Sequence, residues 1–360
     1  MLDYTIRSHQ QAVDLFPMLF QRRTSMRGPE TAQRPPPPLR PALSKANLFY
    51  PAAPSPWQNF AGSPTRYVAK WLYAHQPPAS PPTSSPLVLP SIKVVCIADT
   101  HSQQPGLPHG DILIHAGDLT NNGTFEELQS QLMWLNTLPH THKIVVAGNH
   151  DLLLDNACHD AHKISLVEAA EVSQLNWGSI RYLECTSTTV HVKGRSVRIY
   201  GAPHTPKYGN SAFQYLRSAE VDVWHENIPE NTDVVVTHGP ALGHVDGKRA
   251  GNLGCAHLLR ELRRVKPRVH VCGHIHEARG SESVDWGFLQ WGYDMICSGE
   301  GTWKCVRWWI ASFMACAWLW AWIVYGLLGK KRDAKTTFVN AALMGRQRFV
   351  DGERAVVVEI

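Results

Sequence analysis

The sequence places five short polar segments directly after apolar, β-branched runs: Asp99-Thr100-His101, Gly117-Asp118, Gly148-Asn149-His150-Asp151, Thr237-His238 and Gly273-His274-Ile275-His276. Runs of this kind predict buried β-strands. In sheets built from strand–helix–strand units, ligands bind beyond the carboxyl ends of the strands. We therefore expect the five segments to meet at one rim of the β-structure and to form the functional site there.

The spacing of apolar residues predicts how these segments are connected. Residues 92–98, 111–116 and 143–147 are expected to be strands, and leucines at helical spacing predict a helix over 125–138 that begins with a capping box, Thr124 and Glu127. Further elements are expected at 187–192 and 196–200 (a hairpin), 233–236, 258–265 (a helix), 268–272, and 337–341 with 355–360 (a final strand pair). This is an α/β chain with more strand than one sheet holds, so we expect two packed sheets flanked by helices.

The carboxylate, amide and imidazole groups of the five segments suit two divalent metal ions. Residues i and i+2 of an extended chain point the same way, so two such side chains can reach one ion. Oxygen and nitrogen ligands without thiolate favour Mn, Fe, Zn or Mg, and paired ions are a common device for attacking a phosphate ester with water. The predicted ligands are Asp99, His101, Asp118 and His276 for one ion, and Asp118, Asn149, His238 and His274 for the other.

Two further residues of the third segment are predicted to be catalytic. His150 follows a ligand, and because adjacent side chains diverge it is better placed to donate a proton to a leaving alkoxide. Asp151 is expected to orient His150 and to favour its protonated form. The attacking group is expected to be a hydroxide that bridges the ions.

The other histidines carry weaker signals. His115 and His270 lie within strand runs, so we expect them to be packed or hydrogen-bonded rather than ligating. His204, in Gly201-Ala202-Pro203-His204-Thr205-Pro206, is a candidate substrate-binding residue, and a plain turn residue is the alternative.

Composition narrows the classes of function. A formal net charge of +5 over 360 residues does not indicate a nucleic-acid partner. The eight cysteines include no CxxC pair, which argues against a cysteine-based zinc site and favours free thiols in a reducing compartment. The first thirty residues lack the continuous apolar core of a secretory signal, so we expect an intracellular protein on the cytoplasmic face, with membrane association through the insertion described below. A mitochondrial presequence that uses Arg7, Arg22, Arg23 and Arg27 is the alternative. The sequence makes no prediction about oligomeric state.

Proline content and periodicity divide the chain. Residues 1–90 are rich in proline and are expected to be mostly disordered, although the spacing over 65–75 predicts either a short docking helix or an isolated helical turn. The organised domain is expected over 91–360. A hydrophobic, tryptophan-rich insertion at 303–334 interrupts it.

The core of this insertion, residues 308–328, contains no charged residue, and Arg307 precedes it while Lys330, Lys331 and Arg332 follow it. Its length fits a transmembrane helix, and its tryptophans and basic flanks fit a membrane interface. Because the strands expected after it rejoin the sheets, membrane contact through an in-plane helix over 306–328 is favoured over a span. A buried helix or a self-association surface is the alternative.

The order of these motifs resembles that of the calcineurin-like metallophosphoesterases. More narrowly, it is similar to a small subfamily of metallophosphoesterase-domain proteins that includes a brain cyclic-nucleotide phosphodiesterase. The resemblance covers about 92–300 and 336–360 and is carried by residues 97–101, 115–120, 147–151, 237–240 and 272–277. It implies a four-layer α-β-β-α sandwich with a two-metal centre. Asn121 stands where the wider family often has a second aspartate, whereas His274, which some members lack, is present.

We therefore expect metal-dependent hydrolysis of phosphate esters, above all of phosphodiesters, with His150 as the general acid. A phosphomonoesterase or a nuclease acting through the same site is an alternative. So is a membrane-associated metal-binding protein that does not catalyse a reaction.

Overall fold

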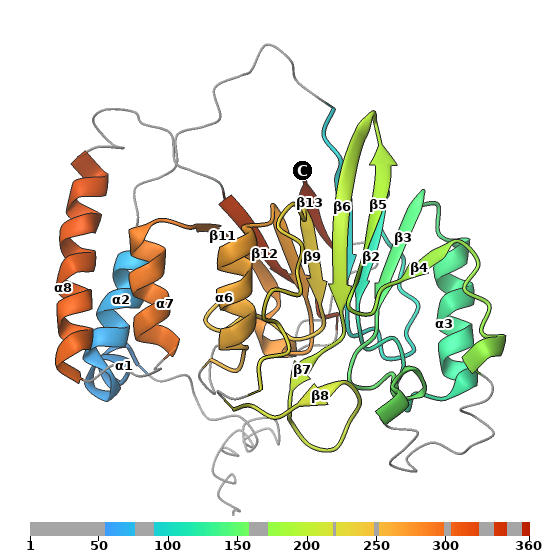
Figure 1. Cartoon of the computed structure of the whole chain (residues 1–360), viewed down its shortest axis with the longest axis horizontal. Helices are drawn as coiled ribbons and strands as arrows, with labels where there is room; N and C mark the ends of the chain where they lie inside the picture. The colour runs from blue at the N-terminus through green and yellow to red at the C-terminus, as the bar shows by residue number, and fades with distance from the viewer. Residues whose placement is uncertain are drawn as a thin grey trace, which may run out of the picture. The chain divides into compact units, whose positions relative to one another are not determined.

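The fold is seen in a computed structural model, which describes residues 55–75, 90–157, 172–218, 221–247, 252–298, 304–323, 335–343 and 355–360. Most of the region expected to be disordered (1–54 and 76–89) and the end of the hydrophobic insertion (324–334) lie outside the described residues. The described elements include two sheets with helices on their outer faces (Figure 1).

The first sheet has five strands in the order β13-β1-β2-β3-β4. They are β1 (Lys93–Ile97), β2 (Ile112–Ala116), β3 (His142–Val146), β4 (Ile180–Tyr182) and β13 (Val356–Glu359). The strands β1 to β4 are parallel, and β13 pairs antiparallel with β1 at the edge. Helix α3 (Phe125–Thr137) covers the outer face, where its leucines pack against residues of β1, β2 and β3.

The start of α3 is tied to the second polar segment. The Thr124 hydroxyl accepts a hydrogen bond from the backbone N–H of Glu127, as the predicted cap requires. The Glu127 carboxylate, however, accepts from the backbone N–H groups of Asn121 (3.2 Å) and Asn122 (2.8 Å). The helix therefore anchors the loop that follows Asp118.

The second sheet has six strands in the order β11-β12-β10-β9-β6-β5. They are β5 (Thr186–Val192), β6 (Arg195–Ala202), β9 (Val234–Thr237), β10 (Val269–Cys272), β11 (Gly280–Asp285) and β12 (Lys335–Asn340). The four central strands are parallel, and β5 and β11 are antiparallel edges. Helix α6 (Ala256–Val265) covers the outer face through Leu258 and Leu262, which pack near Phe338.

The two sheets bury an apolar layer between them, lined by β-branched residues from both sides. The order α3, first sheet, second sheet, α6 is the predicted four-layer α-β-β-α sandwich, which is confirmed. Short elements lie in the connections: β7 (Thr205–Pro206), β8 (Gln214–Tyr215), η2 (Leu152–Leu154), η3 (Val172–Gln174) and η4 (His276–Ala278).

The expected final strand pair is wrong. β12 and β13 do form, but β12 lies between β10 and β11 in the second sheet, whereas β13 is an edge of the first. The reason lies in their surroundings. β12 ends in a run of buried residues, as a central strand requires, and β13 alternates between intermediate and exposed positions.

Four helices form a separate cluster: α1 (Pro56–Gly62), α2 (Pro64–Ala74), α7 (Phe288–Ser298) and α8 (Lys304–Ala321). The helix expected over 65–75 is therefore present as α2, and residues 55–75 are ordered helix rather than part of a disordered region. Helix α8 belongs to the hydrophobic insertion. Within the described residues, no helix is long and apolar enough to cross a membrane.

A buried polar cluster ties α7 to the sandwich. The His244 ring contacts the carboxylates of Glu282 on β11 (Nδ1–Oε1, 3.0 Å) and Asp294 on α7 (Nε2–Oδ1, 3.2 Å). Burial alone would lower the pKa of His244, but these two carboxylates raise it to about 9. His244 is therefore a cation at neutral pH, and it links β11 and α7 to its own loop, which lies 50 residues before Asp294 in the chain.

Candidate metal centre

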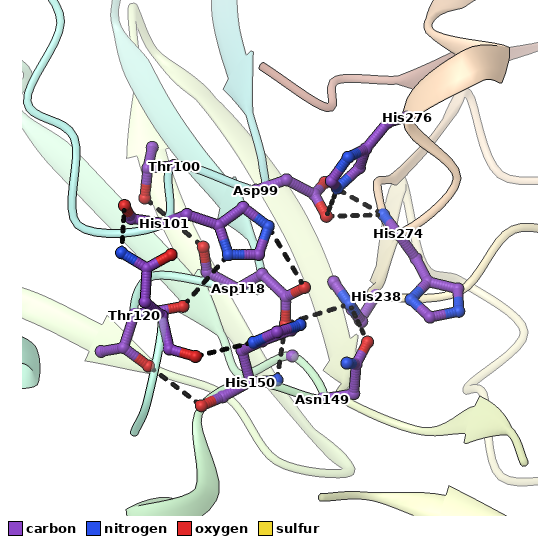
Figure 2. A network of polar contacts seen from close by, with 12 residues as sticks. Asp99, Thr100, His101, Asp118, Thr120, Asn149, His150, His238, His274 and His276 are labelled. Carbon is purple, nitrogen blue, oxygen red and sulfur yellow. Dashed lines mark hydrogen bonds and ion pairs between the residues drawn. The ribbon is translucent and has the colours of Figure 1, made fainter. Parts of the chain in front are cut away.

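The five polar segments converge, as Figure 2 shows. Each follows the carboxyl end of a parallel strand: β1, β2 and β3 of the first sheet, and β9 and β10 of the second. The carboxyl ends of neighbouring parallel strands lie at one edge, so the fold brings together side chains that are up to 177 residues apart.

One cluster consists of Asp99, His101 and His276, whose potential ligand atoms lie within 4.8 Å of one another. Nε2 of His276 is 3.2 Å from Oδ1 of Asp99. Nδ1 of His101 donates to the carbonyl oxygen of Thr120 (3.2 Å), which leaves Nε2 unprotonated in the neutral ring. That Nε2 atom is buried and has no hydrogen-bond partner in the described part of the chain. A buried imidazole nitrogen without a hydrogen-bond partner, on a ring that is fixed through its other nitrogen, fits the role of a metal ligand.

The other cluster consists of Asp118, His238 and His274, again with ligand atoms within 4.8 Å. Nδ1 of His238 donates to the carbonyl oxygen of Ala116 (2.9 Å), so its ring is held in the same way as that of His101. Nε2 of His238 faces Oδ1 of Asp118 at 3.3 Å and Oδ1 of Asn149 at 3.0 Å. The predicted amide ligand therefore belongs to this side of the site.

Asp118 faces both clusters. Its Oδ1 lies 3.3 Å from Nε2 of His238, and its Oδ2 lies 3.8 Å from Nε2 of His101. A single carboxylate with one oxygen toward each cluster has the geometry of a ligand that bridges two ions. The structure thus brings the seven residues predicted as ligands together. A third group of potential ligand atoms, from His101, Asp118 and His150, also lies within 4.8 Å, so His150 stands close enough to contact an ion held by its neighbours.

The charges of the site favour a bound cation. Burial alone would raise the pKa of Asp118, but the neighbouring His238 ring holds it well below its ordinary value. Burial alone would lower the pKa of His238, but Asp118 raises it to about 9. Burial and the nearby His238 charge lower the pKa of His274 to about 4, which keeps that ring neutral and ready to ligate. The pair of Asp118 and His238 therefore holds a proton where a divalent ion would otherwise supply the positive charge.

The backbone of the site is strained in a consistent way. Asp99, His101, Asp118 and His274 all have positive φ, between 44° and 65°. This left-handed conformation costs a residue with a side chain roughly 1–2 kcal/mol. Such strain gathers at functional sites, where the surrounding structure enforces it.

Two glycines allow the segments to approach one another. A Cβ atom on Gly148 would lie 2.3 Å from Oδ1 of Asp118, and one on Gly273 would lie 2.2 Å from Oδ2 of Asp99. Both distances are too short for any side chain. The glycines in the third and fifth segments are therefore part of the site's geometry.

Two buried histidines form hydrogen bonds with threonines that are next to predicted ligands in the sequence. Nε2 of His115 is 2.9 Å from the hydroxyl of Thr100, and Nε2 of His270 is 2.9 Å from the hydroxyl of Thr237. Burial lowers the pKa of each ring to about 3, so both are neutral. They are hydrogen-bonded within strands, as expected. The sequence interpretation missed their threonine partners, although a threonine directly beside a ligand occurs in two of the five segments.

Asp151 does not orient the His150 ring, contrary to the prediction. Its buried carboxylate accepts hydrogen bonds from the backbone N–H groups of Gly148 (2.7 Å), Thr120 (3.0 Å) and Leu119 (3.3 Å), and from the Thr120 hydroxyl (2.8 Å). Burial, and then the negative charge of Asp118, raise its pKa to about 6. The tight turn after Gly148 directs this side chain into the protein, where it links the second and third segments.

His150 lies at the rim of the site. Its Nδ1 donates to the carbonyl oxygen of Asn121 (2.7 Å), and its ring meets that of His101 edge-on at a centroid distance of 4.8 Å. Its backbone N–H donates to Oδ1 of Asp118 (2.8 Å). Because Nδ1 is engaged, Nε2 is the nitrogen that is free to exchange a proton with a substrate.

His204 lies apart from the ligands. Its Nδ1 is 3.5 Å from the Cys185 sulfur, and its ring lies near those of Tyr215 and Trp224. Burial lowers its pKa. It is not among the groups that could hold a metal in the described residues, and its role as a substrate contact stays a prediction.

Comparison with known proteins gives the family. Residues 92–278 match the family model described as calcineurin-like phosphoesterase. The chain belongs to the calcineurin-like phosphoesterase family. Family members typically bind two divalent metal ions.

Relatives of this chain include a fungal and a human protein. The chain is 40% identical over 309 residues to probable rhamnogalacturonate lyase C of Emericella nidulans, a match that covers 84% of this chain and 27% of that protein. It is 40% identical over 205 residues to metallophosphoesterase domain-containing protein 1 of Homo sapiens, covering 52% of this chain and 61% of that protein. The chain thus spans less than two thirds of either relative.

Among solved structures, the chain is similar to phosphopantetheinyl hydrolase from Mycobacterium tuberculosis. The TM-score is 0.34 with 17% sequence identity, and the match covers 52% of this chain and 84% of the other.

Proposed function

We propose that this phosphoesterase hydrolyses phosphate diesters with the help of two divalent metal ions. The observation that carries the proposal is the position of Asp118, which turns one carboxylate oxygen toward each of two His/Asp clusters. A site for a single ion has no need of a second cluster on the other side of the same carboxylate. The donor atoms are carboxylate, amide and imidazole, which suits Mn, Fe, Zn or Mg.

The residues divide the work between holding ions and moving a proton. Asp99, His101 and His276 would hold one ion, and His238, His274 and Asn149 the other, with Asp118 between them. When bound, such ions neutralise charge on the phosphoryl oxygens and make water a nucleophile at neutral pH.

His150 supplies the acid. Its Nδ1 hydrogen bond to the carbonyl oxygen of Asn121 fixes the ring, so that a proton on Nε2 is available to the leaving alkoxide. The ring stands half-exposed beside His101, at the edge where a substrate can enter. This proton matters most for leaving groups that are poor without protonation.

The preference for a diester has its own support. The motif resemblance described above is to a subfamily that includes a cyclic-nucleotide phosphodiesterase. The name of the Emericella relative refers to a lyase, but the match covers 27% of that protein. That name therefore gives no reason to assign lyase chemistry to this chain.

Hydrolysis of two model esters tests the proposal. The full chain is purified, loaded with Mn²⁺ and given bis-p-nitrophenyl phosphate or p-nitrophenyl phosphate, while metal per chain is measured by mass spectrometry. We expect diester turnover that chelation and Asp118→Asn abolish. The matched control is Asp246→Asn, another buried carboxylate that accepts backbone hydrogen bonds, from Gly243 and Gly254.

Three outcomes would contradict the proposal. Faster turnover of the monoester would make the chain a phosphomonoesterase. Bound metal without turnover of either ester would make it a metal-binding protein. Turnover that survives chelation would exclude the two-metal site as its cause.

A further inference from the structure

Helix α8 has one face packed against the protein. Ile310, Ala311, Met314 and Ala321 are buried, at the spacing of one helical face. They contribute to an apolar cluster with α2 and α7, which lie beside α8 (Figure 1). These contacts fix which side of α8 points away from the protein.

The opposite face of α8 is also apolar. Trp309, Phe313 and Trp320 on α8, and Ile323 two residues beyond its end, are 68%, 60%, 59% and 48% exposed. Their spacing places them in a single stripe, which at about 1.5 Å per residue is roughly 21 Å long. Among the other exposed apolar side chains of this segment, Trp308 and Leu319 widen the stripe along one side. We name these six residues the outer stripe. Solvated apolar surface of this extent marks a place where something binds.

The chemistry of the outer stripe favours lipid. Half of its residues are tryptophans, which prefer the boundary between lipid headgroups and acyl chains. Basic residues lie at both ends of the segment, and residues 304–332 contain no Asp or Glu. The basic residues are Lys304, Arg307, Lys330, Lys331 and Arg332. A second copy of the chain would bring the same charges against these, whereas an anionic lipid surface complements them.

The topology keeps both ends of this segment on one side of a membrane. The strands before and after it, β11 and β12, pair directly with each other, from Gly280 opposite Asn340 to Asp285 opposite Lys335. A single crossing would separate two hydrogen-bonded strands. The packed inner face of α8 likewise leaves only its outer face for lipid.

We propose that the outer stripe of α8 binds the surface of membranes that contain anionic lipid, with the helix lying along the surface. The inner face stays on α2 and α7, and the tryptophans enter the headgroup region. The excess of basic residues in the sequence of this segment favours anionic lipid. This inference does not depend on the proposed hydrolysis, and its test measures no turnover.

Liposome flotation tests the inference on the full chain. The vesicles are phosphatidylcholine alone, or phosphatidylcholine with phosphatidylserine. We expect the chain to float with the anionic vesicles, and its partitioning to fall about tenfold or more on neutral ones. The triple variant Trp309→Gln, Phe313→Gln, Trp320→Gln should lose partitioning by about a hundredfold. The matched control replaces Met133 and Leu216, which are 63% and 60% exposed but lie outside α8, by glutamine, and should float like the wild type.

Several results would overturn the inference. One is a wild-type chain that stays with the buffer, and another is a triple variant that floats as well as its parent. Light scattering that shows a wild-type dimer and a monomeric triple variant, without flotation, would identify a second copy as the occupant. If the triple variant does not fold, a second measurement uses the wild-type chain with vesicles of brominated lipids. These lipids should quench its tryptophan fluorescence, and unchanged fluorescence would refute lipid contact.

Discussion

Replacing Asp151 by asparagine separates two roles that this residue could have. In the structure, its Oδ1 accepts from the backbone N–H and hydroxyl of Thr120, and its Oδ2 accepts from the N–H groups of Gly148 and Leu119. Asparagine keeps one oxygen and puts an NH₂ group in place of the other. In either orientation, that NH₂ group faces at least one buried backbone donor.

The stability lost in Asp151→Asn is set by whichever of the two amide orientations is less destabilising. If the NH₂ group replaces Oδ1, the Thr120 hydroxyl can turn and accept, but the Thr120 N–H loses its acceptor. One buried unsatisfied N–H costs about 1–3 kcal/mol. The loops that carry Asp118 and Asn149 also loosen, and loss of such a supporting contact lowers metal affinity by about 10–100-fold.

The assay combines Mn²⁺ titration, urea unfolding of the metal-free chain and turnover of diesters with good and poor leaving groups. We expect Asp151→Asn to bind Mn²⁺ more weakly and to unfold more easily, with equal rate loss on both esters at subsaturating metal. The matched control is Asp246→Asn, in which one oxygen, Oδ2, accepts both backbone bonds, so the amide oxygen can replace it.

A different pattern would refute this account of Asp151. If the residue acted by orienting His150, Asp151→Asn would bind Mn²⁺ normally. Its turnover would then fall mainly on the ester with the poor leaving group.

Three further perturbations test the other roles. His150→Ala should keep its metal and lose about 10²–10⁴-fold in turnover of alkyl diesters but less of nitrophenyl diesters; loss of metal would make His150 a ligand. Gly148→Ala puts a Cβ atom 2.3 Å from Oδ1 of Asp118, and it should lower stability by about 1–3 kcal/mol and reduce the bound metal. Gly106→Ala, with no atom within 4 Å, should change neither. Equal metal content in the two variants would contradict the predicted clash at Gly148. His244, whose pKa is raised from 6.5 to about 9, contributes stability that is complete below pH 6.5 and lost as the pH rises through about 9, on the order of 3 kcal/mol. In urea unfolding, the free energy of unfolding of His244→Gln should therefore decline less steeply with pH over that interval than that of the wild type. A decline as steep as in the wild type would contradict the ion pairs.

The sequence predicted which residues meet at this site because each of them follows a buried strand. A carboxylate or imidazole at the end of such a strand lies at the rim of the sheet whatever its distant neighbours are. The extended backbone assumed for residues two apart was wrong, since Asp99, His101 and His274 all have positive φ.

The parts that the sequence did not predict depend on distant contacts. The direction of the Asp151 side chain is set by the turn after Gly148, which brings it against Leu119 and Thr120 rather than against its neighbour in sequence. The partners of β12 and β13 depend on which strands are already buried beside them. Helices α7 and α8 are apolar on more than one face, so periodicity alone did not show which face meets α2.

Metal stoichiometry tests the central claim most directly. The chain and its His274→Ala and His276→Ala variants are dialysed against Mn²⁺, and the ions bound per chain are measured by mass spectrometry. Since each histidine belongs to a different cluster, the wild type should hold two ions and each variant about one. A wild type that binds no ion, or variants that both still hold two, would contradict a centre built from two clusters around Asp118.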